Sequence, residues 1–535
     1  MRFLPPLLIA SAALAACVGP APSAVAPAAP AASAPLVDLP NAIRTEPLAE
    51  REIRVEVGDL PAPFATESAR KGPDVVPPPA DPVLRVPPGF AVQVWADGLE
   101  HPRWLALAPD GAVLLVESRH NRIKRLEDRD GDGVAEVVET VGTADNGLDL
   151  PLGVAFVGGD LYVGNTSDVR RYGYAAGSAL AGTGTVVADL PGRGYNQHWT
   201  RNVVASPDGD SLYVTVGSES NVDVEELPRA SVFRIAPDGS GRQTVSFGLR
   251  NPVGLDFHPA TGAPYTTVNE RDGLGDGLVP DYLTQIGGNR FFGWPYAYLT
   301  PDRLDPRRTT ASGTSEDPAL AAQTVLPDVL FEAHSAALGL QFYPLDGGST
   351  ASNRFPERYR GGAFVALRGS WNRSQGTGYK VVHVPFVNGE PTGAYQDFLT
   401  GFLLDPSGPT TWGRPVGLLV LPDGSLLMTE EGNGRIYRVS YRGEATSPAP
   451  PDWRRAGRRR ADKGPSADVP ATRAPDSRRT ALSANRAASA SSASRGATGS
   501  PAPRARSPSG SPGPPTPART GPRSPAARRA RVGRR

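Results

Sequence analysis

The chain has little of what cross-links or anchors many proteins of its length. Its 535 residues include one cysteine, two methionines and six histidines. A single cysteine excludes internal disulfides and any zinc site built from cysteines. Beyond the N-terminus, no apolar run approaches the roughly 20 residues that a membrane-spanning helix needs. Glycine and proline are abundant instead, with 60 and 57 residues and no collagen period, which predicts many turns, disordered stretches, or both.

The net charge of +1 conceals two opposed regions. From Ser447 to the end of the chain, about 20 Lys and Arg stand against about 4 Asp and Glu, which leaves the rest at about −15. The composition of this region, with Trp453 as its single aromatic residue, cannot bury enough apolar surface to fold. We predict a disordered basic tail over residues 442–535. It is either a cationic arm or an extension without function, and it lacks the aromatic spacing of a nucleic-acid binder.

The N-terminus has the features of a bacterial export signal. Arg2 precedes a short apolar stretch, and Leu14-Ala-Ala-Cys17 resembles the lipobox, in which the cysteine becomes the lipidated first residue. A lipidated cysteine carries the two or more chains that stable anchoring needs. We predict a lipoprotein signal peptide over residues 1–17 and an Ala/Pro-rich tether over residues 18–84. The protein is then anchored at the periplasmic face of the cell envelope; a stray cysteine in an ordinary signal peptide is the alternative.

The middle of the chain repeats one sequence unit about six times. The segments His101–Glu117 and Arg414–Glu430 each contain an apolar strand pattern, a Pro-Asp-Gly turn and a second apolar strand, and Arg-Ile-x-Arg follows. Weaker copies begin near Pro151, His198, Arg250 and Ala336. Period-two alternation joined by Asp-Gly turns is typical of β-hairpins.

Helical periodicity is nearly absent from residues 85–440. Short antiparallel strands repeated six times without helical crossovers favour an all-β fold, a six-bladed β-propeller over residues 85–441. A propeller must close its ring. We expect Phe90–Trp95 to complete the last blade beside Ile436–Val439.

Residues at the same point of each copy should converge near the centre of such a ring. These positions include Arg103, His198, Arg250 and Arg414, with Arg368 at a nearby strand end. Arginine recognises carboxylates through two parallel hydrogen bonds, and histidine exchanges protons near neutral pH. A group of arginines around one histidine therefore predicts an anionic ligand handled by a base.

Four motifs in order carry a family resemblance: Gly194-Tyr-Asn-Gln-His198-Trp-Thr-Arg, Gly248-Leu-Arg250-Asn251-Pro-Val-Gly, Asn269-Glu-Arg-Asp272 and Gly287-Gly-Asn-Arg-Phe-Phe-Gly-Trp-Pro295. Together they resemble the soluble glucose dehydrogenase and sorbosone dehydrogenase family. The resemblance implies a six-bladed propeller that carries pyrroloquinoline quinone and Ca²⁺. The ordered run is more specific than any single motif.

The resemblance implies roles for individual residues. His198 matches the base that takes the proton of the substrate hydroxyl while hydride passes to the quinone. Arg250 and Asn251 match the pair that hydrogen-bonds the quinone oxygens. Arg368 and Arg414 match basic positions that hold cofactor carboxylates.

The same resemblance places the cofactor's Ca²⁺ at the backbone carbonyls of Arg271 and Asp272. His334 matches the sorbosone branch and is a candidate for the cofactor or substrate pocket, or a structural histidine. The chain departs from the glucose branch in two places. Leu148–Gly153 lacks a glutamine, and Trp412 replaces one of two basic residues. Both departures disfavour glucose and tight cofactor binding.

A second metal motif lies outside these positions. Asp128, Asp130, Asp132 and Glu139 follow the spacing of a calcium loop, with glycine at the sixth position. The flanking sequence predicts strands, so we expect a hairpin loop on the rim that binds Ca²⁺ or forms a solvated acidic turn.

The sequence thus predicts a lipid-anchored quinoprotein dehydrogenase that oxidises a sugar hydroxyl or a hydrated sugar aldehyde such as sorbosone. It would pass electrons to a quinone or cytochrome. One alternative is a calcium-dependent lactonase or esterase using Asn202, Asn251 and Asp272 around a channel metal. Another is a propeller without a cofactor that binds glycans or a partner, since the fold itself does not define a function.

Overall fold

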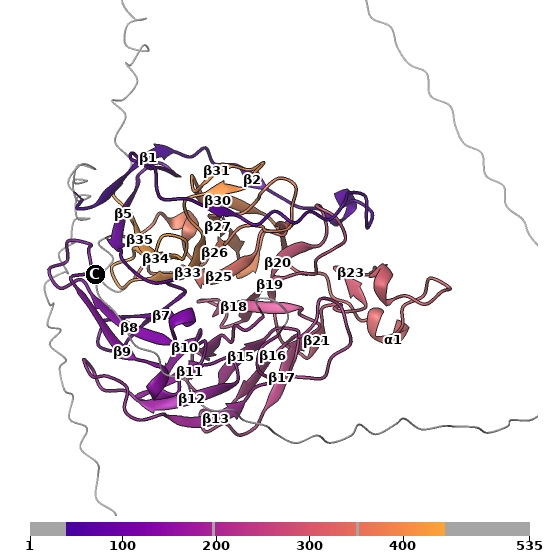
Figure 1. Cartoon of the computed structure of the whole chain (residues 1–535), viewed down its shortest axis with the longest axis horizontal. Coiled ribbons are helices and arrows are strands. Elements are labelled where there is room, and N and C mark those ends of the chain that lie inside the picture. Colours follow the sequence, from indigo (N-terminus) through magenta and orange to yellow (C-terminus); the bar gives the residue numbers. More distant parts are fainter. Residues whose placement is uncertain (1–38, 195–197, 349–352, 444–535) are drawn as a thin grey trace, which may run out of the picture. The chain divides into compact units, whose positions relative to one another are not determined.

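The computed structural model describes residues 39–194, 198–348 and 353–443. Over these residues the regular secondary structure is almost entirely β, with one four-residue α-helix, α1 (Pro318–Ala321), and several short 3-10 helices (Figure 1). No helix within these ranges has the length and apolar character needed to cross a bilayer. The predicted signal peptide, Cys17 and the basic tail beyond Gly443 lie outside the described residues.

Six sheets of four or more strands contain most of the strands in the described residues, and their main strands run antiparallel in chain order (Figure 1). The first three contain β6 (Trp104–Leu107), β7 (Val113–Glu117), β8 (Arg122–Glu127) and β9 (Val137–Gly142); β10 (Val154–Val157), β11 (Asp160–Gly164), β12 (Asp168–Gly173) and β13 (Thr185–Asp189); and β14 (Val203–Ala205), β15 (Leu212–Val216), β16 (Ser231–Ile235) and β17 (Gln243–Phe247), with β21 (Arg290–Phe291) added. The last three contain β18 (Asn251–Phe257), β19 (Pro264–Asn269), β20 (Pro280–Gln285) and β24 (Val329–Ala333); β25 (Ala337–Phe342), β26 (Ala363–Leu367), β27 (Lys380–Val384) and β30 (Tyr395–Leu399); and β33 (Pro415–Val420), β34 (Leu426–Glu430), β35 (Arg435–Tyr441) and β5 (Phe90–Ala96).

The first strands of successive sheets pack against one another. β6 contacts β10, β10 contacts β14, β18 contacts β25, and β25 contacts β33, while the third sheet reaches β18 through β15. β33 in turn contacts β6, so the sixth sheet lies beside the first. Small hydrophobic clusters fill the spaces between the sheets. The cores therefore lie between neighbouring sheets.

Glycines in the first strands allow this close packing. A Cβ on Gly254 of β18 would stand 2.2 Å from the carbonyl oxygen of Leu338 in the next sheet. A Cβ on Gly417 of β33 would stand 2.4 Å from the carbonyl oxygen of Arg103. Both distances are shorter than any van der Waals contact, so the Pro-Val-Gly of the repeat is explained by the approach of the neighbouring strand.

The first and last long strands of the described body are paired. β5 lies antiparallel to β35, with Phe90 opposite Tyr441 and Ala96 opposite Ile436. The pairing predicted for Phe90–Trp95 is confirmed.

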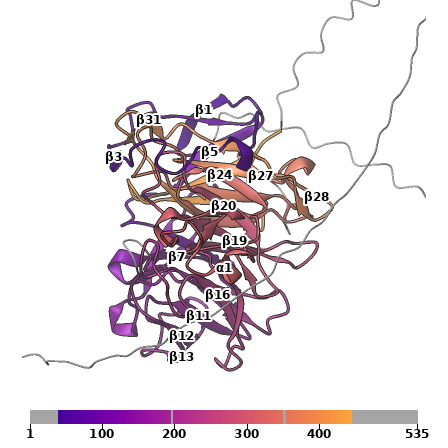
Figure 2. The same ribbon diagram turned by 90° about the vertical axis from the view of Figure 1, so that its right-hand side faces the viewer.

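The prediction of an Ala/Pro-rich tether over residues 18–84 is wrong for residues 39–84, which contain strands that pair with the sheets. We call residues 39–86 the N-terminal strap; it contains β1 (Ala42–Pro47), β2 (Glu52–Ile53), β3 (Asp74–Val75) and β4 (Val83–Val86). β1 and β4 extend the sixth sheet, and β2 extends the fifth. β3 pairs with β32 (Thr410–Thr411), which in turn pairs with β31 (Leu403–Asp405). Figure 2 shows β1, β3 and β31 at one end of the body. The proline-rich composition concealed apolar side chains that pack on the sheets, among them Ile43, Val55 and Leu84.

Candidate active site

A cavity of about 540 Å³ collects the residues that the repeat predicted to converge. Its lining comes from five of the six sheets and from the strap: Arg70, Arg103, Arg119, His198, Thr200, Arg250, Asn251, Val253, Asn269, Glu270, Asp272, Asp281, His334, Ala336, Leu338, Arg368, Trp371, Asn372 and Arg414. This volume lies in the range of small-molecule sites. The second sheet supplies no lining residue in the described part of the chain, and its Leu152 is buried in the core.

Positive charge dominates the lining. Among the described residues, six arginines and three carboxyl side chains line the cavity. Two of the carboxylates are already matched, because Glu270 pairs with the buried Arg271 and Asp272 pairs with Arg250 at 3.0 Å. Burial raises the pKa of the third, Asp281, to about 7, which weakens its negative charge. The cavity therefore favours an anion.

Glu431, which lies behind the lining, holds three of these arginines together. Its carboxylate is ion-paired with Arg103 and Arg368, the Arg368 Nε lying 2.6 Å from Oε1, and Arg414 Nη1 lies 3.7 Å away. Burial alone would raise the pKa of Glu431, but Arg368, Arg103 and Arg414 outweigh it and hold that pKa well below its usual range. One buried carboxylate thus serves three guanidinium groups.

This carboxylate leaves part of the positive charge unmatched. Burial, followed by the repulsion of Arg368, lowers the pKa of Arg414 to about 9. The Nε atoms of Arg103 and Arg414 are buried and have no hydrogen-bond acceptor among the described residues. Buried donors of this kind are costly unless a ligand accepts from them.

His198 is oriented by Ser218. Its Nδ1 lies 3.1 Å from the Ser218 carbonyl oxygen and 3.0 Å from Ser218 Oγ. The Ser218 hydroxyl donates its proton to the Ser220 carbonyl at 2.6 Å, so both Ser218 oxygens accept from the ring. Nδ1 therefore carries the proton of the neutral imidazole, and Nε2 carries the lone pair.

His198 is also kept neutral. Burial lowers the pKa of His198 well below its ordinary value, and the nearby Arg250 lowers it further. Its side chain still lines the cavity, although only 4% of the residue is exposed. A neutral imidazole with a lone pair at Nε2 is the form of histidine that accepts a proton.

Arg250 and Asn251 occupy the start of β18 beside His198. The Arg250 guanidinium donates to the Glu270 carbonyl at 2.6 Å and to the Asp272 carboxylate. The Oδ1 of Asn251 has no donor among the described residues. A Cβ on Gly217 would stand 2.2 Å from this oxygen and 3.1 Å from His198 Cβ, so a glycine is required there for both side chains to fit.

Of the two carbonyls predicted to bind Ca²⁺, that of Asp272 is occupied by hydrogen bonds within the protein. The Asp272 carbonyl already accepts from Asn221 Nδ2 at 3.0 Å and from Arg307 Nη1 at 2.7 Å. A cation at that oxygen would meet the Arg307 guanidinium, so this carbonyl does not fit Ca²⁺. The side chain of Arg271 is fully buried and paired with Glu270 and Asp305, and the role predicted for its backbone carbonyl stays a prediction.

His334 lines the cavity, but both ring nitrogens are engaged by the protein. Nε2 lies 3.0 Å from the Gly275 carbonyl, and Nδ1 lies 3.1 Å from Asn372 Nδ2. Asn372 also donates to Asp272 at 2.8 Å. Nε2 must donate to the carbonyl and Nδ1 must accept from the amide, so His334 helps to build the wall of the cavity rather than to transfer a proton.

A model of the TrAA12-like family matches residues 84–279 and 302–442, which together make up more than half of the chain. The chain belongs to the TrAA12-like family.

This TrAA12-like chain is similar to two curated proteins and to one solved structure. An uncharacterized protein of Borreliella burgdorferi is 28% identical over 371 residues, covering 67% of this chain and 91% of that protein. A pyrroloquinoline quinone-dependent pyranose dehydrogenase of Coprinopsis cinerea is 26% identical over 422 residues. That match covers 66% of this chain and 54% of the relative, so the chain spans about half of the relative's length.

A calcium structure of a Trichoderma reesei carbohydrate-active enzyme of family AA12 has a TM-score of 0.55 and 20% identity, over 73% of this chain and 99% of that one. At this identity the likeness shows the fold. The resemblance to quinone-dependent sugar dehydrogenases that the sequence motifs indicated is confirmed.

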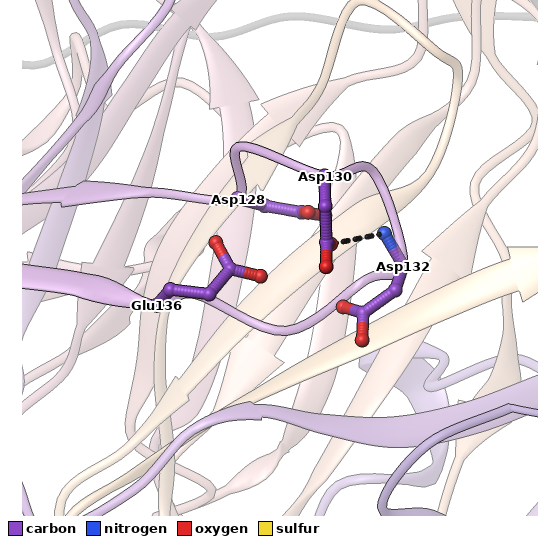
Figure 3. A group of neighbouring side chains, drawn as sticks. All are labelled: Asp128, Asp130, Asp132 and Glu136. Atoms are coloured by element: carbon purple, nitrogen blue, oxygen red, sulfur yellow. Dashed lines mark hydrogen bonds between the residues drawn. The ribbon is translucent and has the colours of Figure 1, made fainter.

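The TrAA12-like match also contains the acidic loop between β8 and β9. Carboxylate oxygens of Asp128, Asp130, Asp132 and Glu136 lie within 4.8 Å of one another (Figure 3). Glu139, the predicted fourth ligand, is replaced by Glu136, because β9 begins at Val137 and carries Glu139 to a position opposite Arg125. The turn holds its carboxylates with its own amides, as where Gly131 and Gly133 donate to Asp128. Within the described ranges this is the one group of three or more acidic, His or Cys side chains close enough to share an ion.

The residues of the lactonase alternative are not gathered around a metal position. Asn202 is fully buried, donates to the Val253 carbonyl at 3.0 Å and does not line the cavity. Asp272 is committed to Arg250.

Sequence reasoning missed Arg70, Arg119 and Trp371, which line the TrAA12-like cavity, and Glu431, which pairs with its arginines. Glu431 was missed although the repeat carries a signal for it: the last copy has a second acidic residue directly after Glu430, where the first copy has Ser118 after Glu117.

Trp412, at one of the departures from the glucose branch, is buried in the core, and its Nε1 donates to the Gly401 carbonyl at 2.9 Å. It therefore takes no place in the cavity.

Proposed function

We propose that this protein is a sugar dehydrogenase that uses pyrroloquinoline quinone, with His198 as its base. One observation carries the proposal: a histidine with its lone pair fixed at Nε2 shares a cavity with an excess of arginines. The name of the Coprinopsis relative supports the cofactor and the sugar substrate.

The cavity fits the quinone by its donor chemistry. Three carboxylates on the cofactor match guanidinium groups that Glu431 leaves incompletely neutralised. The Nε atoms of Arg103 and Arg414, which have no acceptor among the described residues, would supply two further donors. Arg368 and Arg414 would hold the carboxylates, while Arg250 and Asn251 would face the quinone oxygens. Bound quinone would supply the two-electron acceptor for hydride from the sugar carbon.

The protein's own part in the reaction is proton transfer and placement. His198 Nε2 accepts the proton of the sugar hydroxyl as the hydrogen on the same carbon leaves as hydride. The Ser218 oxygens hold Nδ1–H and stabilise the charged ring that results. Arg250 provides fixed positive charge where negative charge develops.

Calcium enters the proposal through the acidic loop at Asp128–Glu136 rather than through the Asp272 carbonyl. Four carboxylate side chains within reach of one ion form the kind of oxygen donor set that Ca²⁺ prefers. The calcium structure of the Trichoderma enzyme supports calcium as a ligand. We propose a structural role for this ion.

We also propose a fold, a membrane anchor and a cellular location for the protein. The six sheets are the blades of a closed six-bladed propeller over residues 85–441, preceded by the strap. Cys17 is the lipidated residue of an exported lipoprotein at the periplasmic face of the membrane, and a membrane quinone or cytochrome accepts the electrons. The substrate is an aldose or a sugar aldehyde such as sorbosone.

Reconstitution tests the function directly. Purified apoprotein is loaded with quinone and Ca²⁺, and dye reduction is followed across a panel of aldoses and sugar aldehydes, with lactone hydrolysis measured in parallel. Oxidation that requires added quinone is the expected result. Lactone hydrolysis without oxidation would select the lactonase alternative, and quinone binding that fails altogether would leave a glycan- or partner-binding protein.

A further inference from the structure

The N-terminal strap is fastened on both sides of the short segment that reaches the cavity. On one side, Thr66 Oγ1 accepts from the Asp276 amide at 2.8 Å and Ser68 Oγ accepts from the Gly275 amide at 3.2 Å. These hydrogen bonds tie the strap to the loop that follows β19. The strap therefore cannot leave the cavity rim without breaking them.

Lys71 fastens the other side. Its amide donates to the Trp371 carbonyl at 2.8 Å, and its Nζ donates to the carbonyls of Ser374 at 3.1 Å and Ser407 at 3.2 Å. Arg70 lies directly between the two sets of anchors. Its backbone is thus positioned at the rim by contacts with two different sheets.

Arg70 and Arg119 differ from the other arginines of the cavity. Both line it and both are exposed. Neither makes a hydrogen bond or ion pair with another residue in the described part of the chain, whereas Arg250 and the arginines around Glu431 are paired and far less exposed. The outer two guanidinium groups are therefore available to a ligand that enters from solvent.

Trp371 stands beside Arg70. It is 37% exposed, which is unusual for the largest apolar side chain, and it lines the cavity. A second cavity of about 130 Å³ shares five lining residues with the first: Arg70, Asp272, His334, Trp371 and Asn372. An exposed indole offers a flat apolar surface to the C–H face of a sugar ring, and the neighbouring guanidinium offers a bidentate site for an anion.

The position of Arg70 separates it from cofactor binding. Arg103, Arg368 and Arg414 already supply one guanidinium group for each of the three cofactor carboxylates, and the family model begins at residue 84, after Arg70. A residue that the strap places at the rim contacts the ligand that binds after the cofactor. In a quinone-dependent dehydrogenase that ligand is the sugar substrate.

We propose that Arg70 and Trp371 form a substrate subsite that selects sugars bearing an anionic group, a carboxylate or a phosphate. Trp371 packs against the ring, and Arg70 pairs with the anion, with Arg119 adding attraction at the same rim. This inference rests on the proposed function for its reaction and on the strap for its specificity.

Three probes and two matched variants test it. The quinone-loaded enzyme is assayed on glucose, glucuronate and glucose 6-phosphate, which share the ring and differ at one carbon. We expect the anionic sugars to have the higher kcat/KM. If charge alone determines the preference, both glucuronate and glucose 6-phosphate are favoured over glucose; if the shape of the anionic group also matters, only one of them is. Arg70→Gln should lower the anionic-to-neutral ratio about tenfold, while Arg51→Gln, an exposed arginine of the same strap outside the cavity, leaves it unchanged. Added salt should reduce the ratio in the parent enzyme.

Calorimetric binding of the three sugars to the unloaded protein gives a readout that needs no turnover. If Arg70→Gln keeps the parent ratio in both assays, the subsite proposal is overturned. It is also overturned if Arg70→Gln weakens quinone binding, because Arg70 then belongs to the cofactor. If no sugar is oxidised although quinone binds, the proposed function fails, and the binding preference alone decides whether the subsite exists.

Discussion

The central cavity and the acidic loop are both strongly charged, but they hold their charges in opposite ways. In the cavity, Arg103, Arg368 and Arg414 come from different sheets and share one buried carboxylate, Glu431. In the loop, Asp130, Asp132 and Glu136 are neighbours in sequence and exposed to solvent. Buried charges that depend on one partner are lost together when it is removed, whereas exposed charges are buffered by water. The comparison predicts large effects for changes in the cavity and small ones in the loop.

The largest effect is expected from His198→Ala. Removing the proton acceptor should lower kcat about 10²- to 10⁴-fold, the usual contribution of a general base, while quinone still binds. Stopped-flow turnover and a quinone titration of the apoprotein measure the two separately. A variant that keeps its turnover would remove His198 from the mechanism.

Glu431→Gln should destabilise the apoprotein by about 3–5 kcal/mol, because the buried Arg103 and Arg414 and the partly buried Arg368 lose their shared anion. Urea unfolding measures it. Glu52→Gln, an exposed partner of Arg54, is the matched control and should change stability by less than about 0.5 kcal/mol. Added quinone should restore part of the loss, since its carboxylates take the place of the missing one. Equal stability of the two variants would show that the cavity is no more sensitive than the surface.

The pH profile sharpens the account of the cavity. Because burial and Arg250 lower the pKa of His198, its neutral form persists below the ordinary histidine value near 6.5. Activity should therefore stay level as the pH falls through 6.5 and decline only at lower pH, where Nε2 becomes protonated. A decline centred at or above 6.5 in kcat/KM would contradict the buried, neutral histidine.

Ser218→Ala should have a moderate effect. It removes one of the two acceptors of His198 Nδ1–H and leaves the backbone carbonyl in place, so the loss of one hydrogen bond predicts about a fivefold fall in kcat. Ser218→Thr, which keeps the hydroxyl, should recover most of it. If kcat is unchanged while stability falls, Ser218 is structural and does not position the base.

The acidic loop should give the smallest response. Calcium is expected to raise the melting temperature of the parent protein by a few degrees through binding to the folded state. Glu136→Gln should abolish most of that shift, and Glu139→Gln should preserve it. The opposite outcome would show that Glu139, and not Glu136, binds the ion, as the calcium-loop motif predicts.

Particular residues show what the sequence could and could not predict. Arg103 and Arg414 were placed together because they occupy the same point of the repeat, and repeated units around an axis bring equivalent positions together. Glu431 was missed because its role depends on which neighbouring sheets it faces. Arg70 was missed because nothing in the repeat encodes the path of the strap. Glu139 was chosen over Glu136 because the calcium-loop motif ends in a helix. Here the loop ends in a strand, which advances the chain about twice as far per residue and carries Glu139 away from the other carboxylates.

The pairing of β5 with β35 has a consequence for how the protein is made. β5 leaves the ribosome among the earliest strands, and its partner is synthesised last of all the strands described. The sixth sheet therefore cannot form until the translation of the whole β-body is complete, and until then an apolar strand edge stays exposed. Such long-range pairing slows folding and exposes the nascent chain to aggregation.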